Sequence, residues 1–187
     1  MSAGAGSRRK RGAVLWGAGA LGRRSNAVSG EGAPPAEPVI GAAGLRVAIV
    51  AARWHSTVVG GLLAGARRAL ADSNVTDVTE VRVPGCFELP VAAARLANHG
   101  FDALIALGVV IRGGTPHFEY VCSAATGGLT AVAERTGVPI GFGVLTCDDD
   151  AQAMDRAGLP GSKEDKGYEA AVAALETAIA LRPFRRS

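Results

Sequence analysis

The chain alternates between short aliphatic runs and longer segments in which apolar residues recur at helical spacing. The clearest aliphatic run covers residues 102–111, where Asp102 is followed by Ala-Leu-Ile-Ala-Leu-Gly-Val-Val-Ile. Polar residues do not interrupt this run, and a strand that is buried on both faces of a parallel sheet has this pattern. The run therefore predicts a central strand of an α/β domain.

The same reasoning predicts three further strands and five helices. We expect strands over residues 45–52, 78–83, 102–111 and 140–146. Apolar residues at helical spacing predict helices over about 58–70, 88–98, 118–133, 149–157 and 168–179. Because strand and helix alternate throughout, we expect one α/β domain: a three-layer sandwich in which a four-stranded parallel sheet carries helices on both faces.

The residues that directly follow the strands are the candidates for function. In open parallel sheets, ligands bind outside the carboxyl ends of the strands. The segments in question are Arg53-Trp54-His55, Gly85 to Glu88, Arg112 to His117, and Thr146-Cys147. Together they would bring an indole, a phenyl ring, a carboxylate, a glycine-rich loop and an imidazole to one edge, which suits a flat polar heterocycle and a phosphorylated small molecule.

The loop after the third strand predicts an anion site beside a proton-transfer group. Gly113 and Gly114 allow the backbone to approach a ligand, and we expect Thr115 to cap the next helix, with Pro116 in its first turn. The free N–H groups of that helix would stabilise a phosphate. A helix N-terminus disfavours imidazolium, so we expect His117 to be a neutral base; the alternative is that it only caps the helix.

Several other candidates have an ordinary structural explanation beside the functional one. Trp54 could stack on a ring or cover the end of the sheet. Glu88 could bind ligand hydroxyls, or could be a first-turn carboxylate favoured by the helix dipole. Arg156 and Lys166 could reach a phosphate or could be solvated surface charges.

The three cysteines, Cys86, Cys122 and Cys147, form no CxxC pair and have no histidine at metal-binding spacing. Neither a metal site nor a disulfide framework is therefore expected, and a reduced, cytoplasmic location is the natural expectation. The cysteines at strand ends are interpreted as packing residues. We expect His55 and His99 to be surface groups.

Composition and charge set the class of protein. At 187 residues and 48% hydrophobic, the chain can form one domain with a full core. Residues 1–44 carry six Lys/Arg against two Glu, whereas residues 45–187 carry fourteen Lys/Arg against fifteen Asp/Glu. The folded part is thus nearly neutral, which argues against nucleic-acid binding, and no apolar stretch is long enough to span a membrane.

Residues 1–44 are rich in Gly, Ala and Pro and have no periodic apolar pattern. We expect them to be a disordered, basic N-terminal arm. A flexible arm or an early start of the reading frame is favoured over a targeting signal, because the apolar segment is short and broken by glycines.

Six segments together resemble the lumazine synthase family. They are VAIVAARWH (47–55), VPGCFELPVAA (83–93), DALIALGVVIRGGTPHFEYV (102–121), PIGFGVLT (139–146), QAMDRAGL (152–159) and DKGYEAAVAAL (165–175). The resemblance covers residues 45–182 and implies a lumazine synthase domain over 45–187 with a flavodoxin-like strand order.

The resemblance also implies a reaction. Members of the family are transferases of riboflavin biosynthesis that condense 5-amino-6-(D-ribitylamino)uracil with 3,4-dihydroxy-2-butanone 4-phosphate, giving 6,7-dimethyl-8-ribityllumazine, phosphate and water. No cofactor or metal is implied. An amine attacks the ketone to give an imine, phosphate is eliminated and a second amine closes the ring, so the resemblance makes His117 the catalytic proton-transfer group.

The family's substrate contacts can be transferred by position in these motifs. Its ring-stacking residue corresponds to Trp54. Pyrimidine and ribityl contacts fall on Cys86, Phe87, Glu88, Val109, Val110 and Ile111. Phosphate contacts fall on Gly114, Thr115 and Arg156, with Lys166 as a further candidate. A neighbouring subunit completes each site at Phe142, where a backbone contact to the pyrimidine is expected.

Shared sites imply a homo-oligomer, and family members form pentamers, some of which close into larger shells. The link from Leu159 to Asp165 is long and contains Pro160. We expect this link to hinder contacts between pentamers, so a free pentamer is predicted. A functional association with riboflavin synthase is a further implied partner, beside the small-molecule substrates.

Two other functions remain as alternatives. A flavodoxin-like binding or signalling domain of the phosphoacceptor type would need acidic residues after the first strand, where this chain has Ala51-Ala52-Arg53. A catalytically silent paralogue could bind a lumazine or riboflavin, or could serve as a shell scaffold. The presence of Thr115, His117 and Arg156 argues against it, since a binder needs no proton shuttle.

Overall fold

Four parallel strands form the central sheet of the fold. The structure is a computed structural model that describes Met1 and residues 35–184. The strands are β1 (Arg46–Ala52), β2 (Asp77–Val83), β3 (Ala103–Ile111) and β4 (Ile140–Cys147). They pair in the order β2-β1-β3-β4, and each neighbouring pair is parallel. This is a flavodoxin-like order, so the predicted strands and fold class are confirmed.

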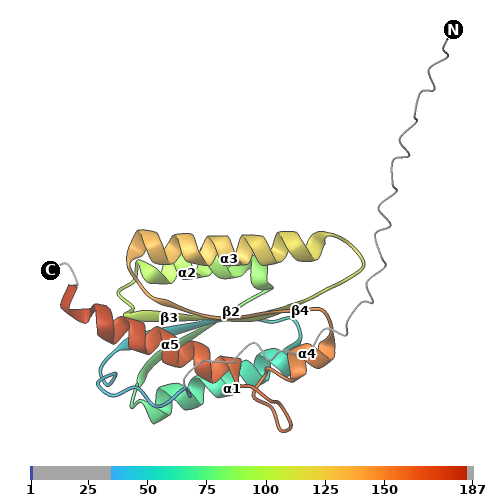
Figure 1. Ribbon diagram of the computed structural model, residues 1–187. Helices are drawn as coiled ribbons and strands as arrows, with labels where there is room; N and C mark the ends of the chain where they lie inside the picture. The colour runs from blue at the N-terminus through green and yellow to red at the C-terminus, as the bar shows by residue number, and fades with distance from the viewer. Residues whose placement is uncertain (2–34, 185–187) are drawn as a thin grey trace. The chain divides into compact units, whose positions relative to one another are not determined.

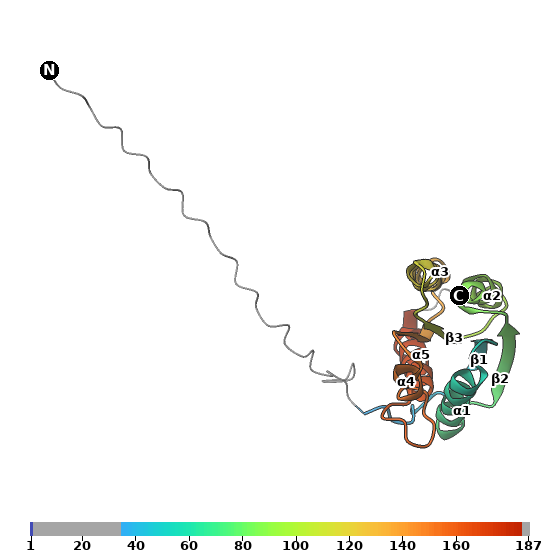
Figure 2. The same cartoon turned by 90° about the vertical axis from the view of Figure 1, so that its right-hand side faces the viewer.

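Helices cover both faces of the sheet, as the sequence predicted (Figure 1). One face carries α2 (Leu89–Ala97) and α3 (His117–Thr136). The other carries α1 (Ser56–Asp72), α4 (Asp150–Met154) and α5 (Lys166–Leu181). Figure 2 views these layers from one end. Two short 3-10 turns complete the order of elements: η1 (Cys86–Glu88) leads into α2, and η2 (Arg182–Phe184) follows α5.

The core lies on both sides of the two inner strands. Successive β1 residues alternate between the layers: Ile49 packs in the cluster beneath α1 and α5, whereas Val50 packs in the cluster beneath α2 and α3. The first seven residues of β3 are buried. Inner strands that are covered on both faces explain why this segment has no polar alternation in the sequence.

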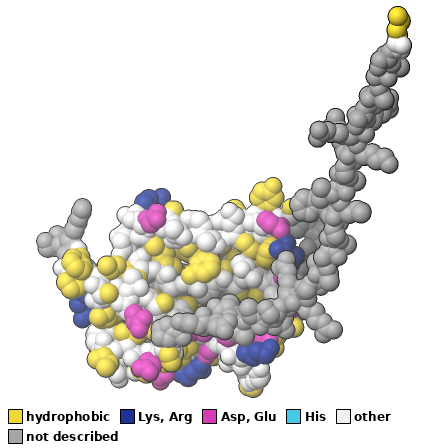
Figure 3. Space-filling view, in the orientation of Figure 1, with side chains coloured by type: hydrophobic (Ala, Val, Ile, Leu, Met, Phe, Trp, Pro, Cys, Tyr) yellow, Lys and Arg dark blue, Asp and Glu magenta, His cyan; other side chains and the backbone are white. Residues whose placement is uncertain are grey.

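The two outer strands differ in what they expose. Most residues of β2 remain accessible. On β4, Phe142 is 45% exposed, and Figure 3 shows apolar side chains gathered along this edge of the sheet between α3 and α5. An apolar sheet edge of this kind is a natural surface for another chain.

Glycines allow α1 to approach the elements around α5 very closely. A Cβ atom on Gly167 would lie 2.0 Å from the carbonyl oxygen of Leu62, and one on Gly61 would lie 2.3 Å from that of Ala157. Real Cβ atoms do not come this close to backbone oxygens, so a side chain at either position would push the two backbones apart.

A short hairpin connects α4 to α5. Ala157 and Asp165 form an isolated antiparallel bridge. The carboxylate of Asp165 then caps α5 by accepting the N–H of Tyr168 at 3.0 Å and pairs with Arg68 of α1. The long link over residues 159–165 is therefore fixed to the domain at its C-terminal end, through Asp165.

The expectation of a disordered arm over residues 1–44 falls mainly on residues 2–34, which lie outside the described residues. Of the remainder, Val39 and Ala42 are buried in the core, and the Val39 N–H donates to the Ser73 hydroxyl at 2.9 Å. The described fold therefore includes residues that precede β1. No helix in the described part of the chain has the length and apolar character needed to cross a lipid bilayer.

Candidate active site

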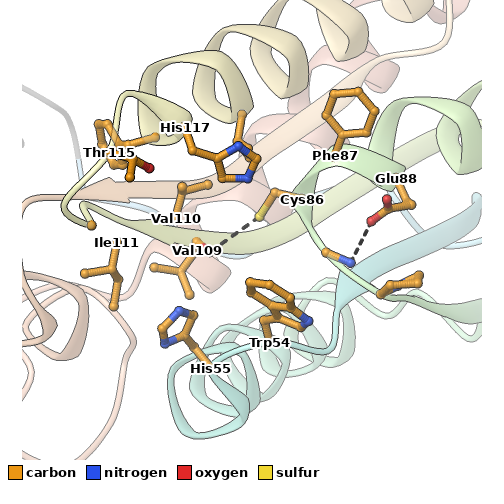
Figure 4. Close-up of a pocket in the computed structure, with 15 residues that line it drawn as sticks. Trp54, His55, Cys86, Phe87, Glu88, Val109, Val110, Ile111, Thr115 and His117 are labelled. Atoms are coloured by element: carbon orange, nitrogen blue, oxygen red, sulfur yellow. Dashed lines mark hydrogen bonds between the residues drawn. The ribbon is translucent and has the colours of Figure 1, made fainter.

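A pocket of about 540 Å³ opens at the carboxyl ends of β1 and β3, between η1 and the start of α3 (Figure 4). This volume lies in the range of small-molecule sites. Its lining residues come from the end of β3 and from the segments that follow the first three strands, and they are Trp54, His55, Pro84, Gly85, Cys86, Phe87, Glu88, Val109, Val110, Ile111, Gly113, Thr115, His117, Phe118 and Val121. Nine of the thirteen residues predicted for the site are among them.

The end of β1 supplies an indole and an imidazole. Trp54 lines the pocket and is 71% exposed, so one ring face is available to a ligand. His55 has the left-handed backbone conformation, with φ 54° and ψ 57°, and stands at the N-cap of α1 without a side-chain cap hydrogen bond. A non-glycine residue with this conformation is uncommon, although histidine adopts it more readily than most.

A buried thiol and a glycine shape the floor of the pocket. Cys86 is 5% exposed, and its thiol donates to the carbonyl oxygen of Val109 at 3.5 Å. Burial raises the pKa of Cys86 to about 11, so the thiol is neutral at physiological pH. Gly108 lies beneath it and has no room for a side chain. The prediction that Cys86 packs rather than reacts is consistent with this environment.

Phe87 and Glu88 form the wall that belongs to η1. One carboxylate oxygen of Glu88 accepts the N–H of Gly85 at 2.8 Å, which holds the turn closed. Glu88 therefore has the structural role that the sequence analysis considered and also faces the pocket. Phe87 is 63% exposed and lies beside it (Figure 4).

The start of α3 differs from its prediction in one detail. We expected Thr115 to cap the helix, but Pro116 is the N-cap residue and α3 has no side-chain cap hydrogen bond. The reason is that Pro116 already has helical dihedral angles, so the Glu119 N–H donates to its carbonyl at 3.2 Å. Thr115 and His117 both line the pocket instead.

Arg112 lies next to the glycine loop but is held outside the pocket lining. Its guanidinium pairs with Glu119, hydrogen-bonds to Asp148 at 3.0 Å, and lies 4.1 Å from the centre of the Phe118 ring. The hydrogen bond from Arg112 lowers the pKa of Glu119, so this exposed pair stays charged near neutral pH.

Four of the predicted site residues lie outside the pocket lining. Gly114 belongs to the same loop, between two residues that do line the pocket. Phe142 is on the edge strand β4, Arg156 follows α4, and Lys166 is the first residue of α5. The predicted residues therefore fall into two groups on the surface of one chain: the pocket with its loop, and the β4–α4–α5 edge.

The two predicted cations on that edge converge on one carboxylate. Glu164 is 10% exposed, and its two oxygens lie 2.5 Å from Lys166 Nζ and 3.8 Å from Arg156 Nε. Lys166 also donates to Glu169 at 2.7 Å. Burial lowers the pKa of Lys166, but the hydrogen bonds to Glu164 and Glu169 outweigh it and leave the pKa raised. The cluster thus pairs two basic side chains with two acidic ones.

Comparison with known proteins decides which family these features belong to. A family model described as 6,7-dimethyl-8-ribityllumazine synthase matches residues 44–182. The chain belongs to the lumazine synthase family. The resemblance inferred from the sequence motifs is thereby confirmed over nearly the same residues.

Named relatives within the lumazine synthase family are highly similar. The chain is 71% identical over 155 residues to a 6,7-dimethyl-8-ribityllumazine synthase of Kineococcus radiotolerans, covering 83% of this chain and 95% of that protein. It is 70% identical over 138 residues to one of Cutibacterium acnes, covering 74% of this chain and 82% of that protein. A Pseudarthrobacter chlorophenolicus protein of the same name is 63% identical over 165 residues, covering 84% of this chain and 99% of that protein.

The sequence analysis placed His55 in a strand-end candidate segment but interpreted it as a surface group, and it did not predict Pro84, Phe118 or Val121 for the pocket wall. His55 was expected at the surface, and it is exposed, but it lines the lumazine synthase pocket beside Trp54. Its position after β1, at the edge where ligands bind, is the signal that favoured a site role over a purely surface one. Among the described residues, no group of three or more His, Cys, Asp or Glu side chains is arranged to hold a metal ion.

Proposed function

We propose that this chain catalyses the condensation of 5-amino-6-(D-ribitylamino)uracil with 3,4-dihydroxy-2-butanone 4-phosphate to 6,7-dimethyl-8-ribityllumazine, phosphate and water. The observation that carries the proposal is a single pocket that combines an exposed indole, a carboxylate, a glycine–threonine loop and an imidazole, in a member of this family. Each of these groups has a task in that reaction.

The pyrimidine binds between Trp54 and the end of β3. The pairing of β3 with β1 stops at Leu107, whereas its pairing with β4 continues to Ile111. Backbone groups of residues 109–111 on the β1 side are therefore outside the sheet ladder, where they can hydrogen-bond to the polar edge of a heterocycle. Glu88 and the backbone around Cys86 and Phe87 bind the ribityl hydroxyls at the η1 end.

His117 transfers the protons. Formation of the imine requires the attacking amine to lose protons and the ketone oxygen to leave as water, and ring closure repeats this exchange with the second amine. One imidazole at the reacting carbons can accept and return each proton. No cofactor is needed, because phosphate is the leaving group and no net oxidation occurs.

The phosphate of the second substrate binds at the loop that precedes α3. Gly114 and Thr115 offer backbone N–H groups and a hydroxyl, and the helix N-terminus favours an anion. Arg156 and Lys166 complete this subsite, and Phe142 completes the pyrimidine subsite, from a neighbouring subunit. Support for the sharing is that these three residues lie outside the pocket lining of their own chain, Phe142 exposed on the edge strand β4 and the two cations next to or on α4 and α5, which contact that strand.

The assembly proposed is a free homopentamer that acts in the cytoplasm. The thiols of Cys86, Cys122 and Cys147 are free, as is usual for proteins of a reducing compartment. A functional association with riboflavin synthase belongs to the same proposal, because that enzyme consumes the product.

The direct test is to mix the purified protein with both substrates and follow the absorbance of the lumazine. We expect a rate above that of the spontaneous condensation. A rate equal to the spontaneous one, together with tight binding of the lumazine, would instead identify a catalytically silent binding protein.

Sharing of the site can be tested by complementation. His117→Ala disables the pocket and Arg156→Ala disables the β4–α4–α5 edge, so each variant alone should be impaired. Dissociating, mixing and reassembling the two variants should regenerate some intact sites and raise the activity above the mean of the separate variants. No gain, in a mixture shown to contain hybrid assemblies, would place the whole site within one subunit.

A further inference from the structure

In the part of the chain that the structure describes, no Lys or Arg side chain lines the pocket. Of its fifteen lining residues, none is Lys or Arg, and the titratable side chains are His55 from the start of α1, His117 from α3, and Cys86 and Glu88 from η1. A phosphorylated substrate brings a dianion into this pocket. Among the described residues that line the pocket, only the two imidazoles can supply positive charge.

The nearby cations are already neutralised by carboxylates. Arg112 pairs with Glu119 and Asp148. Arg156 and Lys166 converge on Glu164, and Lys166 also pairs with Glu169. Moving Arg156 or Lys166 fully onto a phosphate would weaken an ion pair that is already formed. A further anion-binding group in the pocket itself would therefore add to the binding that these cations provide.

The placement of His55 suits that task. Although it is the N-cap residue of α1, its side chain does not bond to the helix, and no hydrogen bond or ion pair joins its ring to another described residue. The ring instead lines the pocket. Figure 4 shows Glu88 on one side of the pocket, with Trp54 and then His55 successively farther toward the side of Ile111 and Thr115. With the ribityl chain at Glu88 and the pyrimidine on Trp54, the phosphate end is the end of His55.

The uncommon backbone of His55 directs its ring. The left-handed conformation at φ 54° occurs directly where β1 gives way to α1. Such conformations often mark functional positions, because the surrounding structure must hold them in place. Here the turn places the imidazole and the preceding indole on the wall of one cavity.

We propose that His55 binds the phosphate group of the phosphate-ester substrate as an imidazolium, making it a specificity-determining residue for that substrate. This role rests on the proposed condensation. The dianion favours the charged form of the ring, and the ring N–H donates a charge-assisted hydrogen bond to a phosphate oxygen. His117, at the reacting carbons, keeps the separate task of transferring protons.

The variant that tests the proposal is His55→Asn. Asparagine tolerates the left-handed conformation and remains polar, so the change removes the ionisable ring with little backbone strain. The matched control is His99→Asn. His99 lies after α2, near the amino end of β3 and away from the pocket, where its ring contacts the Arg95 carbonyl.

The first readout is steady-state kinetics with each substrate varied in turn. We expect His55→Asn to raise the KM for the phosphate ester about tenfold, the scale of one hydrogen bond to a charged group. The KM for the pyrimidine should change less than twofold, and His99→Asn should match the wild type. An equal rise in both KM values would indicate a structural role, and unchanged values would remove His55 from the site; either result overturns the proposal.

The second readout is inhibition by sulfate, which stays a dianion over the whole pH range of interest. Between about pH 6 and about pH 8, the wild-type inhibition constant should rise as imidazolium is lost. In His55→Asn this rise should shrink, leaving the part that comes from His117. Parallel pH profiles for wild type and variant would overturn the proposal.

A third measurement separates this proposal from the proposed reaction. The rise in the thermal unfolding midpoint with added sulfate reports anion binding without turnover. An inactive wild type would refute the reaction, whereas a sulfate effect that is equal in wild type and His55→Asn would refute the anion site alone. The same unfolding measurement with inorganic phosphate shows whether the site binds the free phosphate ion or only the phosphate ester.

Discussion

The sulfur atom of Cys86 occupies the space that a side chain on Gly108 would need. A Cβ atom built on Gly108 would lie 2.5 Å from Cys86 Sγ, and 3.4 Å from atoms of Ala52 and Leu89. The floor of the pocket is therefore a close contact between η1 and the middle of β3, and it depends on one position without a side chain and one with a small buried thiol.

Gly108→Ala should destabilise the protein by about 1–3 kcal/mol, the usual range for overpacking a core. Adding Cys86→Ala removes the clashing atom, so the double variant should recover most of the loss. Thermal unfolding of both single variants and the double variant, at equal protein concentration, measures the coupling. If the stability changes of the two single variants simply add in the double variant, the clash with Cys86 Sγ is not what excludes a side chain at position 108.

The pKa of Cys86 predicts a pH dependence of stability. The folded protein holds the thiol neutral up to about pH 11, against an ordinary value of 9.0. The unfolded chain therefore loses this proton first, and the free energy of unfolding falls as the pH rises from 9 to 11, by up to about 2 kcal/mol from this group. Cys86→Ala should show a flatter decline in its unfolding midpoint over this interval. If the unfolding midpoint falls equally steeply with pH in the wild type and in Cys86→Ala, the loss of stability does not come from the raised pKa of Cys86.

Trp54 should control the affinity for the pyrimidine. Trp54→Ala removes the stacking surface and should raise the KM for that substrate by roughly twofold to tenfold, since aromatic contacts contribute about 0.5–1.5 kcal/mol. Trp54→Phe keeps a ring and should lose less. The KM for the phosphate ester is the internal reference, and its parallel rise would indicate general damage to the pocket.

His117→Ala should lower kcat by no more than about 100-fold, the lower end for loss of a general acid–base group. The effect is modest because the substrates condense spontaneously and positioning supplies much of the acceleration. Single-turnover rates with both substrates saturating provide the measurement. A variant as fast as the wild type would assign proton transfer to solvent or to the substrates.

Arg156→Ala should raise the KM for the phosphate ester by about tenfold, with little effect on the pyrimidine. Arg156→Lys keeps the charge but loses the planar guanidinium, so it should recover only part of the affinity. The comparison is the KM for the phosphate ester, measured on the assembled oligomer of the wild type and of each Arg156 variant. A KM equal to that of the wild type in Arg156→Ala would leave Arg156 as a partner of Glu164 alone.

Local patterns predicted the fold well because its inner strands are covered on both faces. The unbroken aliphatic run of β3 is the pattern that a strand buried on both faces typically has. The strand ends then identified Trp54, Glu88 and His117 as neighbours, although they are up to 63 positions apart in the chain. The rule about carboxyl ends of parallel strands needs no knowledge of side-chain packing.

The misplaced residues depend on features that residue type does not reveal. His55 was expected to be a surface group, and it is exposed; its place on the pocket wall depends on a left-handed backbone conformation that residue type does not reveal. Thr115 was expected to cap α3, but Pro116 begins the turn with its own fixed dihedral angle. The pairing of Arg156 and Lys166 with Glu164 depends on the α4–α5 hairpin, a tertiary contact that helical and strand periodicity do not encode.

The close approach of α1 to α5 limits the mutations that the gene can accumulate. At Gly61 and Gly167 a side chain of any size would meet a carbonyl oxygen of the opposing segment, so even the smallest exchange, to alanine, is blocked. In a randomly mutagenised library under selection for folded protein, these two codons should remain almost invariant. The exposed positions of the same helices should meanwhile diversify freely.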